Sequence, residues 1–153
     1  MPQDLKRMLI AIEDGKSDEQ VVETALDLAT DEGAEVIFVH VLAIPGEGFV
    51  ATGEVAHVPE RATNEVLVKA CEKAQSRGLE ATSELLIGYP ARQIALVADE
   101  LDVDLIVVGS RRLSALKRAV LGSTSRALLT ESGRRVLVVP LTAEQPARET
   151  TLV

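Results

Sequence analysis

A short basic segment in the last third of the chain contains the residues whose types and spacing could do chemistry. From Leu105 to Thr130 there is no Asp or Glu, whereas the whole chain carries a net charge of −8. The same segment holds five cationic side chains, namely Arg111, Arg112, Lys117, Arg118 and Arg126. A local excess of positive charge in an acidic protein favours the binding of an anion.

Glycine and hydroxyl residues in this segment indicate which anion. Gly109 directly follows the apolar run 105–108, which is typical of a strand buried on both faces. Gly122, Ser123 and Thr124 open a helical pattern. Backbone N–H groups at a helix start bind phosphate, and glycine lets the backbone come close to it. The pattern predicts a phosphate site, although a plain turn at Gly109 and a helix N-cap at Ser123 would give the same residues.

The rest of the chain alternates strand-like runs with helical patterns. The predicted strands are 5–12, 36–42, 80–87, 105–108 and 135–139, and the predicted helices are 18–33, 60–77, 90–101 and 123–132. This alternation predicts an α/β fold with a mostly parallel, five-stranded, doubly wound sheet and helices on both faces. The partly polar run 80–87 is typical of an edge strand.

Domain organisation follows from the same pattern. Residues 1–141 are expected to form one domain, and residues 142–153 a disordered tail. Residues 43–58 show no helical or strand period and contain several Gly and Pro residues. Because long irregular loops in compact domains are usually functional, we expect this loop to fold as a flap over the phosphate site.

Composition excludes several classes of protein. Aromatic residues make up 2% of the chain and the pI is about 4.8, which argues against nucleic-acid binding. A single cysteine, Cys71, allows no internal disulfide and indicates a reducing compartment. Since no stretch approaches the roughly 20 apolar residues that span a membrane, we expect no membrane partner and a cytoplasmic location.

Catalytic and metal-binding patterns are also missing from the sequence. There is no Gly-x4-Gly-Lys-Ser/Thr phosphate loop and no nucleophile elbow. His40, His57 and Cys71 are the only histidines and cysteine, and they are not clustered as metal ligands would be. His40 is expected to be a structural histidine at the end of a buried strand. We therefore predict no catalytic residue, no metal ligand and no enzyme activity.

The ordered motifs resemble those of the universal stress protein family. The string Gly109-x2-Arg112-x9-Gly122-Ser123 is similar to that family's signature, Gly-x2-Gly-x9-Gly followed by Ser or Thr. Residues 104–111, 136–140, 33–36 and 88–91 resemble further family strings, so that the likeness covers about residues 5–140. The resemblance implies strand order 3-2-1-4-5, as in adenine nucleotide alpha hydrolase-like and other Rossmann-like folds. Ligands then bind between the first and fourth strands.

The resemblance also implies a ligand, ATP or a related adenine nucleotide, with Mg²⁺ accompanying it. The positions that would contact the base and ribose are Ala11, Ile12, Glu13 and Val41. The positions that would contact the phosphates are Val108, Gly109, Arg111, Arg112, Gly122, Ser123 and Thr124.

Two positions depart from the family pattern. Glu13 stands where the family usually has Asp, and Arg112 replaces the second signature glycine. If that glycine is left-handed, Arg112 costs about 1 kcal/mol or more. A charge-assisted contact from Arg112 to a phosphate would contribute about 1.5–3 kcal/mol. Because these terms are comparable, the sequence leaves nucleotide binding open.

The sequence is therefore consistent with three functions. The first is a nucleotide-binding sensor or regulator in the stress response, acting on an unknown protein partner. The second is a nucleotide-free dimeric interaction module, and the third is a slow ATP hydrolase. The family implies a homodimer, and the apolar strand Val136–Val139 would supply an edge for it.

Overall fold

The computed structural model describes residues 4–13, 18–43, 55, 57–58, 64–110, 126–129 and 132–140. In these residues strands and helices alternate as the sequence predicts. The elements are β1 (Arg7–Ala11), α1 (Asp18–Glu32), β2 (Glu35–Ala43), α2 (Glu65–Ser76), β3 (Ala81–Gly88), α3 (Pro90–Glu100), β4 (Leu105–Ser110) and β5 (Val136–Pro140). Residues 126–129 are also helical.

The strands form one sheet in the order β3-β2-β1-β4-β5, and each neighbouring pair is parallel. In this register Ile10 of β1 lies between Phe38 of β2 and Val107 of β4. The structure confirms both the predicted fold class and the strand order that the resemblance implied. β3 is an edge strand, as its polar residues indicated.

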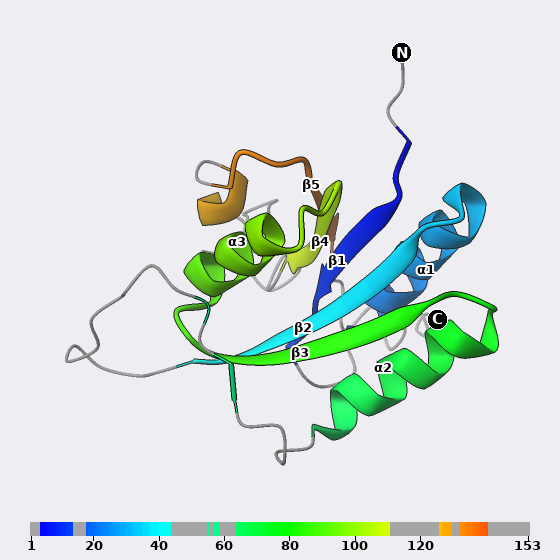
Figure 1. Cartoon of the computed structure of the whole chain (residues 1–153), viewed down its shortest axis with the longest axis horizontal. Coiled ribbons are helices and arrows are strands. Elements are labelled where there is room, and N and C mark those ends of the chain that lie inside the picture. Colours follow the sequence, from blue (N-terminus) through cyan, green and yellow to red (C-terminus); the bar gives the residue numbers. More distant parts are fainter. Residues whose placement is uncertain are drawn as a thin grey trace, which may run out of the picture.

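The core has two layers because side chains along each strand alternate between the two faces of the sheet. Met8, Ile10 and Phe38 pack against α1 and α2, whereas Leu9 and Ile106 pack against α3 and Leu128. Figure 1 shows α1 and α2 on one side of the sheet and α3 on the other. Burying each such side chain contributes roughly 1.5–3 kcal/mol, so these two layers supply most of the stability.

Local signals fix the helix ends. The Asn64 side chain accepts a hydrogen bond from the Leu67 N–H at 3.1 Å, so α2 begins at Glu65 rather than at the predicted residue 60. Pro90 occupies the first turn of α3, as predicted. Gly33 follows α1 with φ of 71°, a left-handed conformation that glycine adopts easily.

β4 extends further than the sequence indicated. The predicted strand stops at Val108, but pairing with β5 continues through Gly109 with Val139 and Ser110 with Pro140. The prediction failed because the end of this strand is set by its partner strand and not by its own apolar run. As a result Ser110 is part of the sheet, and it is buried.

The irregular loop after β2 is described only in part. His57 forms an antiparallel bridge with Leu86, and the Val58 N–H donates to the Leu85 carbonyl at 2.9 Å. His57 Nδ1 also lies 3.0 Å from Glu84 Oε1. Residues 57–58 thus lie along the outer edge of β3. Apart from Ala43 and Val55, the remainder of the predicted flap lies outside the described residues, as does the predicted tail 142–153, and the domain division at residue 141 stays a prediction.

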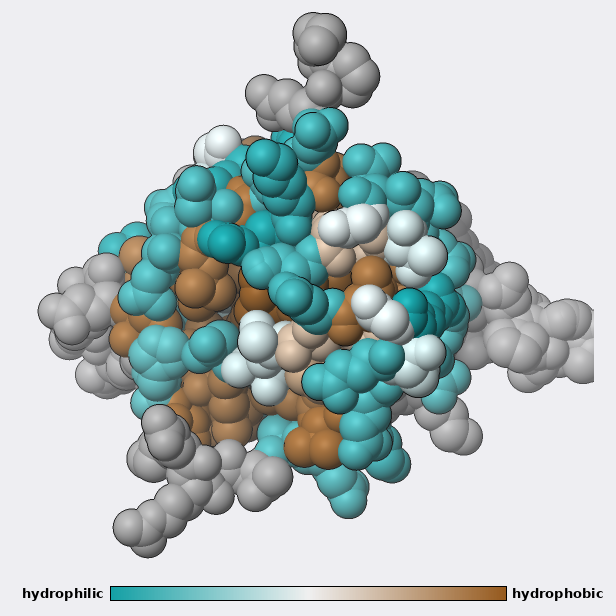
Figure 2. All heavy atoms as spheres, turned by 45° about the vertical axis from the view of Figure 1, so that its right-hand side comes forward, coloured by the Kyte–Doolittle hydropathy of each residue, from teal (hydrophilic) through white to brown (hydrophobic). Residues whose placement is uncertain are grey.

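The surface view in Figure 2 shows hydrophobic residues divided by hydrophilic ones on the face that it presents. None of the helices in the described part of the chain is both long and apolar enough to cross a membrane.

Candidate functional site

The parallel topology gathers the carboxyl ends of the strands at one edge of the sheet, here called the carboxyl edge. In a strand–helix–strand unit each helix starts near that edge, so the positive ends of α1 and α3 also point there. Ala11 ends β1, Val41 lies near the end of β2, and Gly109 lies near the end of β4. Since β1 and β4 are neighbours, as the resemblance implied, the end of β1 lies beside the end of β4.

Five of the expected site residues cannot be placed. Those residues, Arg111, Arg112, Gly122, Ser123 and Thr124, lie outside the described residues. The structure does describe the other six, namely Ala11, Ile12, Glu13, Val41, Val108 and Gly109.

A single peptide group at the exit of β1 is held by side chains from two other elements. The carbonyl of Ile12 accepts a hydrogen bond from His40 Nδ1 at 2.9 Å. The N–H of Glu13, in the same peptide group, donates to Asp18 Oδ2 at 3.0 Å. Because a carbonyl only accepts, Nδ1 of His40 carries a proton and donates it to this bond. His40 is therefore a structural histidine at this edge.

This arrangement, here called the β1 clamp, limits what the β1 exit can offer a ligand. The Ile12 N–H also donates to the Val39 carbonyl at 2.9 Å. Three backbone groups that could have contacted a base are thus engaged inside the protein. Ile12 is buried and Glu13 is exposed, so β1 presents a fixed backbone followed by an exposed carboxylate side chain.

Buried polar side chains concentrate at the carboxyl edge. Asp18 begins α1, Gln93 lies in the first turn of α3, and Ser110 ends β4. These are the buried polar or charged residues of the described part of the chain. Because burying a polar group is costly, their shared position points to this edge as the candidate site.

Ser110 was missed by the sequence reasoning. Its side-chain oxygen is buried and has no hydrogen-bond partner among the described residues. Its position directly after Gly109 was visible, but its burial could not be inferred while the strand was expected to end at Val108. Asp18 was expected only as a helix N-cap, and its bond to Glu13 gives it a second role at the edge.

A cavity of about 330 Å³ adjoins the β1 clamp between α1 and α2. Its apolar lining comes from Ile12, Val22, Val66 and Ala70, and its charged lining from Asp18, Glu19, Lys69 and Lys73. This mixture suits a ligand with an apolar body and a polar end.

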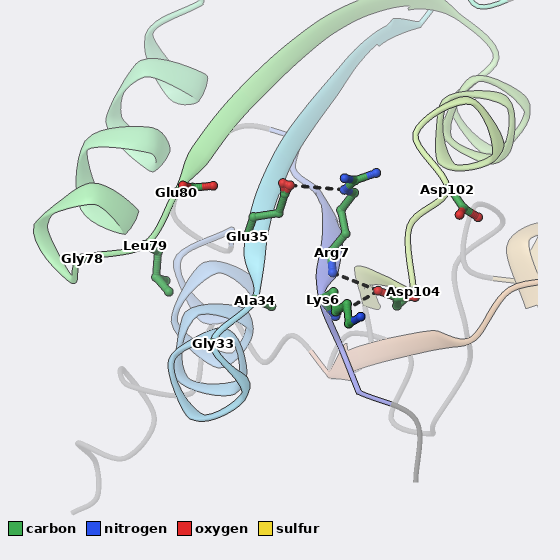
Figure 3. Close-up of a pocket in the computed structure, with 10 residues that line it drawn as sticks. All are labelled: Lys6, Arg7, Gly33, Ala34, Glu35, Gly78, Leu79, Glu80, Asp102 and Asp104. Atoms are coloured by element: carbon green, nitrogen blue, oxygen red, sulfur yellow. Dashed lines mark hydrogen bonds and ion pairs between the residues drawn. The ribbon is translucent and has the colours of Figure 1, made fainter. Parts of the chain in front are cut away.

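A cavity of about 620 Å³ lies at the opposite edge of the sheet, here called the amino edge. Figure 3 shows that its charged groups contact one another: Arg7 Nε lies 3.2 Å from Glu35 Oε2. Asp104 Oδ2 accepts the backbone N–H groups of Lys6 and Arg7 at 2.9 and 3.0 Å. These pairs are exposed and satisfied, so this cavity is not the candidate site despite its size. In the described part of the chain, no three His, Cys, Asp or Glu side chains form a metal-binding group.

Comparisons with known proteins agree with this fold. Residues 4–140 match the model of the universal stress protein family. Universal stress protein YxiE of Bacillus subtilis is 34% identical, over 87% of this chain and 97% of that protein.

Two solved structures share the fold. A universal stress protein in complex with cAMP is 21% identical with a TM-score of 0.69, over 92% of this chain and 100% of that one. One from Archaeoglobus fulgidus in complex with dAMP is 23% identical with a TM-score of 0.62, over 90% and 99%. From the family match and the identity to YxiE, the chain belongs to the universal stress protein family.

Proposed function

We propose that this protein binds an adenine nucleotide at the carboxyl edge, in the crevice between β1 and β4. The observation that carries the proposal is the strand order, which brings the β1 clamp and Gly109 together where the helix N-termini point. Polyphosphates favour such an edge because of the helix dipoles and backbone N–H groups. The complexes of two similar structures with cAMP and dAMP support the choice of an adenine nucleotide.

The proposed contacts are those that the family resemblance implies. Ala11, Ile12, Glu13 and Val41 would bound the base and ribose. Because the β1 clamp engages the amides of Ile12 and Glu13, these residues would act through shape and through the Glu13 carboxylate, which can accept a ribose hydroxyl. Val108, Gly109, Arg111, Arg112, Gly122, Ser123 and Thr124 would hold the phosphates, and Mg²⁺ would accompany ATP.

We further propose that the nucleotide-bound protein acts as a cytoplasmic sensor or regulator, as a homodimer joined through β5. The two edge strands differ in a way that supports pairing through β5. Residues 57–58 pair with Leu85 and Leu86 on the outer edge of β3, whereas β5 has one neighbour, β4, among the described strands. An uncovered apolar edge strand is the usual place for another chain to pair. This observation also favours the second candidate, a dimeric interaction module that needs no nucleotide.

Calorimetric titration with AMP, ADP and ATP, the last two with Mg²⁺, tests the proposal. We expect a dissociation constant below about 1 mM, which corresponds to about −4 kcal/mol. Gly122→Val is expected to remove binding while circular dichroism shows a folded domain. The control is Gly33→Asn at the amino edge, because Asn tolerates the left-handed conformation there and should leave the affinity unchanged.

Absence of binding in the wild-type protein would leave the interaction module. Sedimentation should then show a dimer without nucleotide, and Val138→Lys in β5 should make it monomeric. Steady-state release of phosphate from ATP tests the third candidate, the slow hydrolase.

A further inference from the structure

Ser110 carries a further inference, because it is a buried hydroxyl at the carboxyl edge with no structural task. Its exposed fraction is 2%, and its Oγ has no hydrogen-bond partner among the described residues. Most buried polar side-chain atoms in native proteins have a partner, so one without any calls for an explanation. Among the described residues, Ser110 Oγ is the buried side-chain nitrogen or oxygen atom that has no hydrogen-bond partner.

The comparison with Asp18 sharpens this point. Both residues are buried at the same edge of the sheet. Asp18 is used by the fold, because its carboxylate accepts the Glu13 N–H at 3.0 Å. Ser110 Oγ makes no such bond in the described part of the protein, so an alanine there would satisfy the fold equally well.

The face of the sheet indicates which part of a ligand Ser110 would meet. Ile106 and Val108 of β4 pack in the same layer as Leu128, which lies in the helical residues 126–129. Because side chains alternate along a strand, Ser110 shares that face. Ile12 and the cavity beside it belong to the other face, with α1 and α2. Ser110 therefore lies on the face of Leu128 and directly after Gly109, one of the residues that the proposed function assigns to the phosphates.

We propose that Ser110 is a nucleotide-binding residue whose hydroxyl donates a hydrogen bond to a phosphate oxygen. This inference rests on the proposed function, since it needs a nucleotide at the carboxyl edge. A hydroxyl that is already buried makes a strong bond to an anionic oxygen because it loses little hydration when the ligand arrives.

The test measures two quantities in Ser110→Ala, the melting temperature without nucleotide and the affinity for AMP. Without nucleotide, removal of an unpartnered hydroxyl should leave the melting temperature unchanged or raise it. With AMP, loss of a hydrogen bond to a charged group should weaken binding by about tenfold. Ser110→Cys, which keeps the side-chain size and only a weak donor, should weaken binding similarly.

Ser132→Ala is the matched control. The Ser132 hydroxyl is satisfied, since Oγ accepts the Arg134 N–H at 3.1 Å and donates to the Arg134 carbonyl at 3.3 Å. The same substitution there should lower the melting temperature and leave AMP affinity unchanged.

Titrations with adenosine separate the phosphate from the nucleoside. Adenosine should bind wild type and Ser110→Ala equally, because it has no phosphate. An equal loss for adenosine and AMP would overturn the phosphate assignment and place the hydroxyl against the nucleoside. Unchanged AMP affinity in Ser110→Ala would overturn the inference while the proposed function stands. If the wild type binds neither AMP nor ATP, the proposed function fails and the inference fails with it.

Discussion

The amino edge and the carboxyl edge of the sheet differ in the burial of their polar side chains. At the amino edge, Arg7 pairs with Glu35, Asp104 accepts two backbone N–H groups, and Arg134 contacts Asp99 and Asp102. These residues are at least partly exposed. At the carboxyl edge the polar side chains Asp18, Gln93 and Ser110 are buried.

The difference teaches that size is a poor guide to the site in this fold. The cavity at the amino edge is about 620 Å³, against about 330 Å³ beside the β1 clamp. Yet exposed pairs that satisfy one another contribute little individually and do not by themselves indicate a ligand site. Polar groups that stay buried at a cost, where parallel strands end, are a stronger sign of function.

The largest expected effect is at the β1 clamp. Asp18→Ala removes the acceptor of the Glu13 N–H, and a bond to a charged group contributes about 1.5–3 kcal/mol. Urea denaturation should show a loss of about 2 kcal/mol, and AMP affinity should fall because the β1 exit is released. Asp18→Asn keeps an acceptor oxygen and should recover most of both. Unchanged affinity in Asp18→Ala would remove the clamp from the proposed site.

A smaller effect, on stability alone, is expected at Asp104. Asp104→Ala loses the two bonds that tie Lys6 and Arg7, at the start of β1, to the start of β4. Water can replace an exposed acceptor, so the expected loss is about 1 kcal/mol in urea denaturation. Titration with AMP should give the wild-type affinity. A drop in AMP affinity would show that the two edges are coupled and would contradict the expectation that the amino edge contributes to stability alone.

Arg134→Met should have a still smaller effect. The Arg134 guanidinium lies 3.0 Å from Asp99 and 3.3 Å from Asp102, and Nη1 donates to the Val103 carbonyl at 2.7 Å. Both carboxylates are exposed and screened by solvent, so we expect a loss of about 0.5 kcal/mol. The loss should shrink in 1 M NaCl, which screens the ion pairs but not the bond to the carbonyl. A loss independent of salt would assign the effect to that single bond.

The smallest effect is expected midway along α2, at Cys71. Burial raises the pKa of the Cys71 thiol, and a hydrogen bond from Ser83 opposes part of that rise. At pH 8 less thiolate is present than in the unfolded chain, so Ellman's reagent should react more slowly with the native protein than with the urea-unfolded one.

The same pKa shift fixes the sign of a pH effect. Because the folded-state pKa is raised, the stabilisation is complete below the ordinary thiol pKa and is lost as pH rises through the folded value. Cys71→Ser should remove this alkaline loss. Saturating AMP should leave the thiol reaction rate unchanged, and an altered rate would extend the nucleotide's influence beyond the carboxyl edge.

The fold was largely predictable because its signals are local. Alternating apolar runs and helical patterns give the parallel α/β class, and Pro90 and Gly33 mark helix ends. The strand order came from the family resemblance, since no local pattern encodes it. The errors at α2 and β4 have specific causes: Asn64 competes as a cap within a longer helical pattern, and β5 extends the pairing of β4.

For the candidate site, the edge of the sheet could be predicted, but its side-chain contacts could not. The contact between His40 and Ile12 joins residues 28 apart in the sequence, and it depends on the register of β1 with β2. The burial of Ser110 depends in turn on how far β4 extends. Such contacts follow from packing between distant segments, so residue types and spacing could not reveal them.

The segment at His57 and Val58 has a consequence for assembly. Its pairing with Leu85 and Leu86, beside the 3.0 Å contact between His57 Nδ1 and Glu84 Oε1, occupies these positions on the outer edge of β3. A sheet with two open margins can polymerise into a fibre, whereas one with a single open margin can only meet another copy once. Because residues 57–58 already pair with β3, a second chain would have to displace them to extend the sheet at that strand, which disfavours open-ended growth of the sheet.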